Sequence, residues 1–271
     1  MRPDDRIQKC NAGQGFRWIV GASFLLQQGA GSLVGVGALW LLLSMVAVVP
    51  LIGQLILAVV TPLLTAGVLA AFDEISADRY PRSSILLAGW NRAKARPGLL
   101  LLGVWTIIGA MISLTFLASW LGSQFSEQAL EAALQAPENL GAMIEQLTPG
   151  AGLYGAIAVV VLVVMGLYFA IPLAFFGEAS PWSGVRASIK AIVINTPAFL
   201  VFGLGMALVV GAFIFVLISV VGLVSQLPGT LGMMLAQILI LVLSMTLQIF
   251  LAGAQYLAFC DVFGWSAKAP D

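Results

Sequence analysis

Residues 30–72 decide the fold, and their sequence is AGSLVGVGALWLLLSMVAVVPLIGQLILAVVTPLLTAGVLAAF. This run of 43 residues contains no charged side chain. As one helix it would be roughly 64 Å long at about 1.5 Å per residue, whereas about 20 apolar helical residues already cross the hydrocarbon core of a bilayer. The run therefore predicts two crossings. We expect the break at VPLIG, residues 49–53, because proline lacks an N–H and glycine permits a tight turn.

The same arithmetic predicts four further crossings. Residues 98–120 and 152–176 are each long enough for one. Residues 191–260 form 70 uncharged positions with a single polar break at SQLPGT, residues 225–230, so we expect two long, tilted helices at 197–222 and 231–259. Together with helices at 30–49 and 51–72, the prediction is an all-α polytopic membrane protein. Its single membrane domain, residues 1–271, is a bundle of six transmembrane helices.

The composition excludes several classes of protein. Of 271 residues, 61% are hydrophobic and 9% are charged, against about 25% charged residues in a soluble domain. The 12 Lys and Arg residues are balanced by 12 Asp and Glu residues, so the cationic excess that nucleic-acid binding needs is absent. With no His and 2 Cys, the chain argues against an imidazole or thiolate metal site. No phosphate-binding loop, nucleophile elbow or metalloprotease helix is recognisable, and we expect no cofactor and no catalytic residue.

Loop charges predict the orientation. The segments 1–29, 73–97, 177–196 and 260–271 hold 4, 5, 2 and 1 of the basic residues, which accounts for all 12. By the positive-inside rule both termini are cytoplasmic, and the acidic segment 121–151 lies outside. Cys10 and Cys260 then face a reducing compartment, where a disulfide is not expected. A cleavable secretory signal is not expected either, because the first apolar run is too long and a second span follows at once.

The cytoplasmic segments resemble one another and suggest a repeat. Helices 51–72, 152–176 and 231–259 end in Phe72-Asp73-Glu74, Phe176-Gly177-Glu178 and Phe259-Cys260-Asp261, each an aromatic residue followed two positions later by a carboxylate. Amphipathic stretches precede the hairpins in segments 1–29, 73–97 and 177–196. We predict three units, each an interfacial helix followed by a transmembrane hairpin, with hairpins at 30–72, 98–176 and 197–259. The alternative is that the match reflects interface chemistry common to most membrane helices.

This arrangement, together with VPLIG at 49–53 and TPLLTAG at 61–67, resembles a broad group of functionally uncharacterised six-helix proteobacterial inner-membrane proteins. The resemblance implies a helical bundle in a bacterial inner membrane. It brings no catalytic residues to transfer.

Neutral polar residues on the last helix form a candidate site. Intramembrane ionisable groups usually mark function, and the predicted spans contain none. Gln237, Ser244, Gln248 and Gln255 are spaced by 7, 4 and 7 residues, which places them on one helical face. The functional interpretation is a polar track lining a path or cavity. The structural interpretation, which we prefer, is hydrogen bonding between helices.

Two further sets of residues are candidates. Small residues at helical spacing, Gly31 and Gly35 on the first helix and Gly203, Ala207 and Gly211 on the fifth, predict close helix packing within the bundle or in a dimer. Asp73, Glu74, Glu178 and Asp261 are acids at the inner interface. Paired acids can serve as acid and base, but no nucleophile or metal accompanies them, so we favour ion pairs with lipid headgroup contacts.

The sequence leaves the specific function open. Our first hypothesis is a non-enzymatic inner-membrane protein that handles a lipid-like or apolar small molecule, or supports envelope homeostasis. The alternative is a structural or assembly partner of another membrane complex. Expected partners are membrane lipids and either a second copy of the chain or another membrane protein. An intramembrane enzyme acting on lipids has little support.

Overall fold

The computed structural model describes residues 7–126, 128–129, 145–224, 226–227 and 230–267. Six helices within them are long and apolar enough to cross a membrane, which confirms the predicted all-α polytopic architecture. They are α2 (Ala30–Ser44, extended by the 3₁₀ turn η2, Met45–Val48), α3 (Ile52–Ser76), α5 (Arg96–Gln124), α8 (Ala151–Phe176), α10 (Thr196–Val224) and α11 (Thr230–Phe263). About half of the acidic segment 121–151, which we predict to face the outside, lies outside the described residues.

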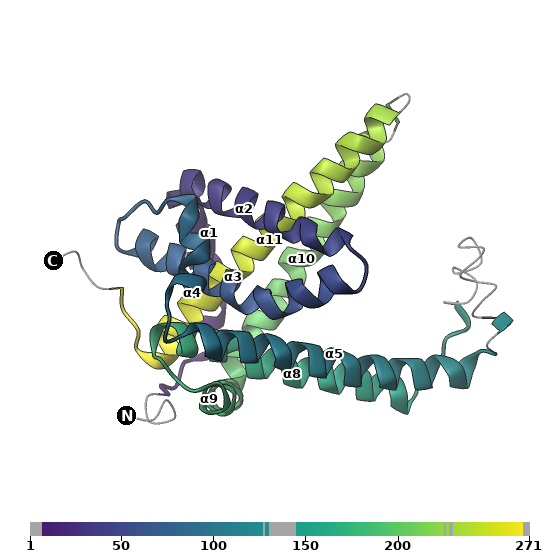
Figure 1. Ribbon diagram of the computed structural model, residues 1–271, viewed down its shortest axis with the longest axis horizontal. Coiled ribbons are helices and arrows are strands. Elements are labelled where there is room, and N and C mark those ends of the chain that lie inside the picture. The colour runs from purple at the N-terminus through teal and green to yellow at the C-terminus, as the bar shows by residue number, and fades with distance from the viewer. Residues whose placement is uncertain (1–6, 127, 130–144, 225, 228–229, 268–271) are drawn as a thin grey trace.

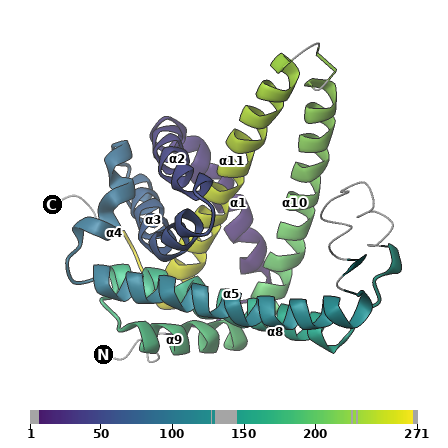
Figure 2. The same ribbon diagram turned by 45° about the vertical axis from the view of Figure 1, so that its right-hand side comes forward.

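The six helices form three hairpins that share one end. In Figure 1, α1, α4, α9 and the described ends of the chain gather on the left, while the hairpins α5–α8 and α10–α11 extend away from them. Figure 2 shows α10–α11 rising steeply from the plane of α5–α8, so that the hairpins diverge. The bundle is therefore tight at the end that we predict to be cytoplasmic and open at the other.

The break between the first two spans is a γ-turn at the predicted position. Leu51 has φ 62° and ψ −64°, and the N–H of Ile52 donates to the carbonyl oxygen of Pro50 at 2.7 Å. These values match the rare form of the turn, whose central residue is strained. Gly53 then packs so tightly that a Cβ there would lie 1.8 Å from the carbonyl oxygen of Val46. The two helices are thus joined by very few connecting residues.

Two of the three second helices run further at their inner ends than the sequence predicted, while α8 ends at Phe176 as predicted. Helix α3 continues to Ser76 rather than ending at Phe72, and α11 continues to Phe263 rather than ending at Phe259. Asp73 and Asp261 are therefore helical residues. Each carboxylate accepts hydrogen bonds from indole or phenol groups nearby, so a charge at these positions does not require the helix to stop.

The three second helices also end alike. A residue just past each helix has a positive φ: 56° at Asp78, two positions after α3, 50° at Glu178, two positions after α8, and 62° at Gly264, directly after α11. After α3 and α11 the next N–H reaches back five residues, from Arg79 to Glu74 and from Trp265 to Cys260, as in a Schellman cap. The threefold repeat stays a prediction, which the similar caps after α3 and α11 support.

An interfacial element precedes each hairpin: α1 (Ala12–Gln28), the pair η3 (Ser83–Leu87) and α4 (Ala88–Asn91), and α9 (Pro181–Ile194). Each packs on the hairpin of a different unit. A Cβ at Gly67 of α3 would lie 2.0 Å from the carbonyl oxygen of Leu86 in η3, and a Cβ at Gly15 of α1 would lie 2.0 Å from that of Ala198 in α10. Helix α9 packs on α8, where the hydroxyl of Ser188 accepts a hydrogen bond from the N–H of Phe169. Since η3–α4 joins the first hairpin, α9 the second and α1 the third, the three units interlock in a ring.

The hydrophobic core lies at this shared end. Its largest fully buried side chains include Trp18 of α1, Phe72 of α3, Phe169 of α8, and Tyr256 and Phe259 of α11. By contrast, none of the most apolar stretch of α10 is buried inside the chain. The outer half of α10 therefore faces lipid or another protein.

Candidate functional site

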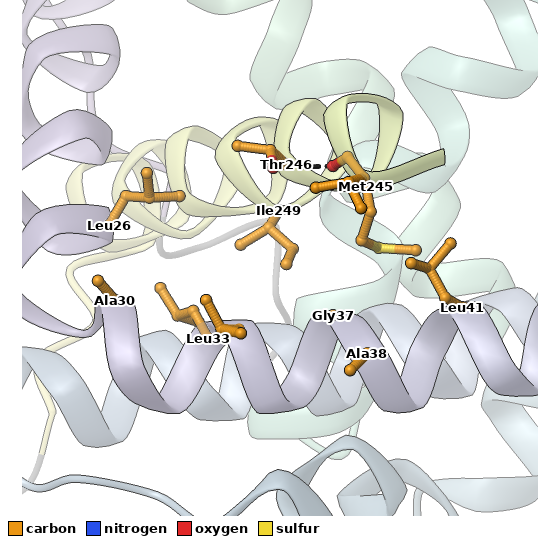
Figure 3. Close-up of a pocket in the computed structure, with 11 residues that line it drawn as sticks. Leu26, Ala30, Leu33, Gly37, Ala38, Leu41, Met245, Thr246 and Ile249 are labelled. Carbon is orange, nitrogen blue, oxygen red and sulfur yellow. Dashed lines mark hydrogen bonds between the residues drawn. The ribbon is translucent and has the colours of Figure 1, made fainter. Parts of the chain in front are cut away.

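An apolar groove lies between α2 and α11 in the membrane-spanning part of the structure. Figure 3 shows Met245 and Ile249 of α11 pointing toward Leu33 and Leu41 of α2, with Leu26 of α1 closing one end. The hollow has a volume of about 220 Å³. Its walls are almost entirely aliphatic.

The groove continues toward the outer end of α2. A second hollow of about 620 Å³ shares Ala38 and Leu41 with the first and extends to Val48 and to Leu241 of α11. Small-molecule sites typically occupy about 300–1,000 Å³. From Ala30 to Val48 the α2 wall is roughly 27 Å long at about 1.5 Å per residue, close to the hydrocarbon thickness of a bilayer, about 30 Å. The groove is therefore long enough to accompany one lipid chain.

Two small residues of α2 create the groove. A Cβ at Gly37 would lie 2.9 Å from Cδ1 of Ile249, so glycine lets α11 approach α2. Its neighbour Ala38 is exposed and lines both hollows. The hydroxyl of Thr246 donates to the carbonyl oxygen of Val242 at 2.9 Å, so this polar side chain is already satisfied within its own helix. The groove can bind an apolar chain by shape, and it offers no group for proton transfer.

The predicted polar track does not line this groove. Gln237 and Gln248 are exposed on α11, and Ser244 is half-buried; none of them is among the lining residues. Only Gln255 reaches another helix, where its amide donates to the carbonyl oxygen of Tyr168 in α8. The groove uses the adjacent face of α11 instead.

The contact of Gln255 has a specific cause in the sequence of α8. Pro172 lacks an N–H, so the helical hydrogen bond to the carbonyl of Tyr168, four residues earlier, cannot form. Gln255 supplies the missing donor. Half a turn away, the hydroxyl of Ser188 in α9 accepts from the N–H of Phe169 at 2.8 Å and donates to the carbonyl oxygen of Met165. The ladder of α8 is thus opened at the proline and closed again by side chains from two neighbouring helices.

The predicted packing glycines have few neighbours. In the described part of the chain, no atom of another element lies within 4 Å of a Cβ built at Gly31, Gly203 or Gly211, while one at Gly35 would meet Cβ of Ser83 at 3.3 Å. Ala207 is exposed. The small-residue face of α10 therefore stays open along this chain.

The inner acids all have partners. Asp73 accepts hydrogen bonds from the hydroxyl of Tyr256 at 3.0 Å and from the indole of Trp265 at 2.8 Å. Asp261 accepts from the indole of Trp18 at 2.8 Å. These bonds tie α1, α3, α11 and the segment after α11 together at the shared end. Their geometry is that of structural anchors.

The other two acids form ion pairs. Glu74 binds Arg79 through two nitrogens, and this hydrogen bond raises the pKa of the Arg79 guanidinium. Glu178 lies 3.5 Å from the ammonium of Lys94.

A buried asparagine holds the N-terminal segment in place. Asn195 is fully buried at the junction of α9 and α10. Its Oδ1 accepts from the backbone N–H of Cys10 at 2.7 Å, and its Nδ2 donates to the carbonyl oxygen of Gln8 at 3.1 Å. Sequence reasoning missed this residue. Its signal was an uncharged polar side chain just before Thr196 and Pro197, at a helix boundary.

The rest of the described chain offers no metal centre, since no group of three Cys, Asp or Glu side chains comes together there. Cys10 and Cys260 are free thiols. Comparison of the sequence with protein-family models, and of the chain with curated proteins and solved structures, finds no match.

Proposed function

We propose that this integral membrane protein handles a lipid-like or other elongated apolar molecule by holding one chain of it in the α2–α11 groove, without covalent chemistry. The observation that carries the proposal is the length of the groove, which follows α2 from Ala30 to Val48. The charge pattern of the loops supports a cytoplasmic location for both termini, and the resemblance carried by residues 49–53 and 61–67 supports a bacterial inner membrane. The function then depends on exchange with the surrounding lipid.

The physics of such a site favours exchange over tight storage. A chain that moves from water into protein gains about 0.8 kcal/mol per buried CH₂, but a chain that comes from the bilayer leaves an equally apolar solvent. Binding must therefore come from packing against the walls of the groove. A groove formed by Gly37 and Ala38 selects for a slender, flexible chain, and it releases that chain readily.

A photo-activatable phospholipid tests the proposal. We would reconstitute the protein in phosphatidylcholine vesicles containing a phosphatidylcholine with a diazirine on one acyl chain, irradiate them, and map the labelled peptides. We expect labelling of the groove walls on α2 and α11, and a several-fold loss of it in Ala38→Trp, where the indole fills the groove. Ala110→Trp is the matched control, because Ala110 is an exposed alanine of α5 outside the groove. Equal labelling of the groove in both variants would exclude the site.

The second candidate function is assembly with another membrane protein or with a second copy. The exposed face of α10 with Gly203, Ala207 and Gly211 supports it, since small residues let helices approach closely. In native membranes, Ala207→Cys would then form a cross-linked species that the exposed lipid-facing control Ala110→Cys does not form. Absence of any adduct specific to Ala207→Cys would leave lipid handling as the sole candidate.

A further inference from the structure

A separate hollow at the inner end of the molecule differs from the α2–α11 groove because charged side chains line it. It has a volume of about 630 Å³ and lies between the η3–α4 segment and the inner ends of α3 and α8. Its polar lining residues are Glu74, Arg82, Ser84, Asn91 and Arg92.

The net charge facing this hollow is positive. Glu74, the acid in its wall, is bound to Arg79. Among the residues that the structure describes, the guanidinium groups of Arg82 and Arg92 form no ion pair. Arg92 lies 5.0 Å above the ring of Phe175, a cation–π contact that holds the guanidinium in place and leaves its N–H donors free. Two arginines with available donors suit a phosphate, which accepts such donors in pairs.

An apolar hollow adjoins the charged one. It has a volume of about 450 Å³ and is lined by Leu57, Val60 and Leu64 of α3 and by Trp90 of α4, with η2 on its far side. Asn91 lines both hollows. The short segment η3–α4 therefore separates a cationic space from an apolar one, and a ligand that fits both must be amphiphilic.

The fold explains why the two spaces meet. Gly89 of α4 lies against α3 so closely that a Cβ there would be 2.5 Å from the carbonyl oxygen of Leu63. This contact holds α4 against α3, so that Trp90 and Asn91 line the apolar hollow while Asn91 and Arg92 line the charged one. Neither the charged hollow nor the apolar one shares a lining residue with the α2–α11 groove.

We infer that this double hollow binds an anionic phospholipid, with the phosphate between Arg82 and Arg92 and one acyl chain against Leu57, Val60 and Leu64. Basic pockets between transmembrane helices on the cytoplasmic side are suited to such headgroups. A free phosphate would use the same arginines and leave the apolar hollow empty. The site is independent of the proposed function of the groove.

Titration of the detergent-solubilised protein with phosphatidylglycerol, followed by native mass spectrometry, tests the inference. Each arginine that contacts the anionic headgroup contributes about five-fold to its binding, so we expect Arg82→Gln/Arg92→Gln to weaken phosphatidylglycerol binding by roughly 25-fold. The control Arg17→Gln/Lys190→Gln removes the same charge from exposed positions outside the hollow and should bind as the wild type does. Equal affinity of the two double variants would overturn the site.

Three further arms separate the sources of the ligand. Phosphatidylcholine should bind far more weakly than phosphatidylglycerol, and inorganic phosphate at the same concentration should not displace the lipid. Displacement by phosphate would assign the arginines to a soluble anion and overturn the inference. A photo-activatable phosphatidylglycerol on the wild-type protein needs no variant: we expect labelling at residues 56–64 and 87–91, and labelling confined to α11 would reject this site while supporting the groove.

Discussion

The bond between Gln255 and the carbonyl oxygen of Tyr168 makes the stability of the protein depend on a proline. Replacing Gln255 with leucine leaves that carbonyl without a donor, because Pro172 has no N–H to give. A buried polar group that loses its partner costs about 1–3 kcal/mol, while measured hydrogen bonds between membrane helices average about 0.6 and reach about 1.7 kcal/mol. Because the proline removes the usual partner, we expect a value near the upper end, about 1–2 kcal/mol.

Replacing Pro172 with alanine should abolish this dependence. Alanine at that position donates its own N–H to Tyr168, so in the Pro172→Ala background the change Gln255→Leu should cost less than about 0.5 kcal/mol. Pro172→Ala has an effect of its own, since the ring is buried in α8, but a double-mutant cycle subtracts it. The expected coupling is about 1 kcal/mol, within the range found for residues in contact.

Equilibrium unfolding of the four proteins in mixed micelles, followed by tryptophan fluorescence as the denaturing detergent is increased, measures the cycle. A coupling of this size changes the ratio of folded to unfolded protein about five-fold. If Gln255→Leu destabilises both backgrounds equally, the glutamine does not serve the carbonyl freed by proline, and its contribution must come from packing or from a polar track.

Two more outcomes follow from local geometry. Leu51 occupies the left-handed region that disfavours a side chain, so Leu51→Gly should raise the free energy of unfolding by about 1 kcal/mol, whereas Leu55→Gly, in the helix that follows, should lower it by a similar amount. Burial, and secondarily the charge of Asp261, raise the pKa of the Cys10 thiol. In a Cys260→Ser background, the rate of maleimide labelling of Cys10 should therefore rise at a higher pH in the folded protein than in the unfolded chain. Asp261→Asn should lower the pH at which this rise occurs. An unchanged labelling profile in Asp261→Asn would contradict the stated role of the carboxylate.

The spans could be predicted from the sequence because their signal is one-dimensional. A charge-free run has a length, the bilayer has a thickness, and the quotient gives the number of crossings. The predicted break at residues 49–53 coincides with the γ-turn at Leu51, because proline and glycine act on the backbone locally. The inner ends of α3 and α11 were harder to place, because whether Asp73 or Asp261 can continue a helix depends on indole and phenol donors that come from distant parts of the chain.

The residues that line the candidate site could not be predicted from helical spacing alone. Helical spacing places Gln237, Gln248 and Gln255 on one stripe of α11, but spacing says nothing about what faces each turn of a helix that diverges from its neighbours. Near the shared end the stripe meets α8; further out it is exposed. The groove beside it depends on Gly37 and Ala38, whose significance comes from the approach of α11, a contact between the first hairpin and the last.

The ring of interlocked units bears on how the protein assembles in the membrane. Helix α1 precedes the first hairpin, yet its buried contacts are with the third: Gly15 packs on Ala198, and Trp18 donates to Asp261. Asn195 adds hydrogen bonds from the N-terminal segment to the start of α10. The hydrogen-bonded partners lie 185 to 243 residues apart along the chain, so α1 cannot reach its place until the last hairpin has inserted. Until then the face with Trp18 and Ile19, which the finished fold buries, is suited to the membrane surface, and this accounts for the amphipathic pattern of α1.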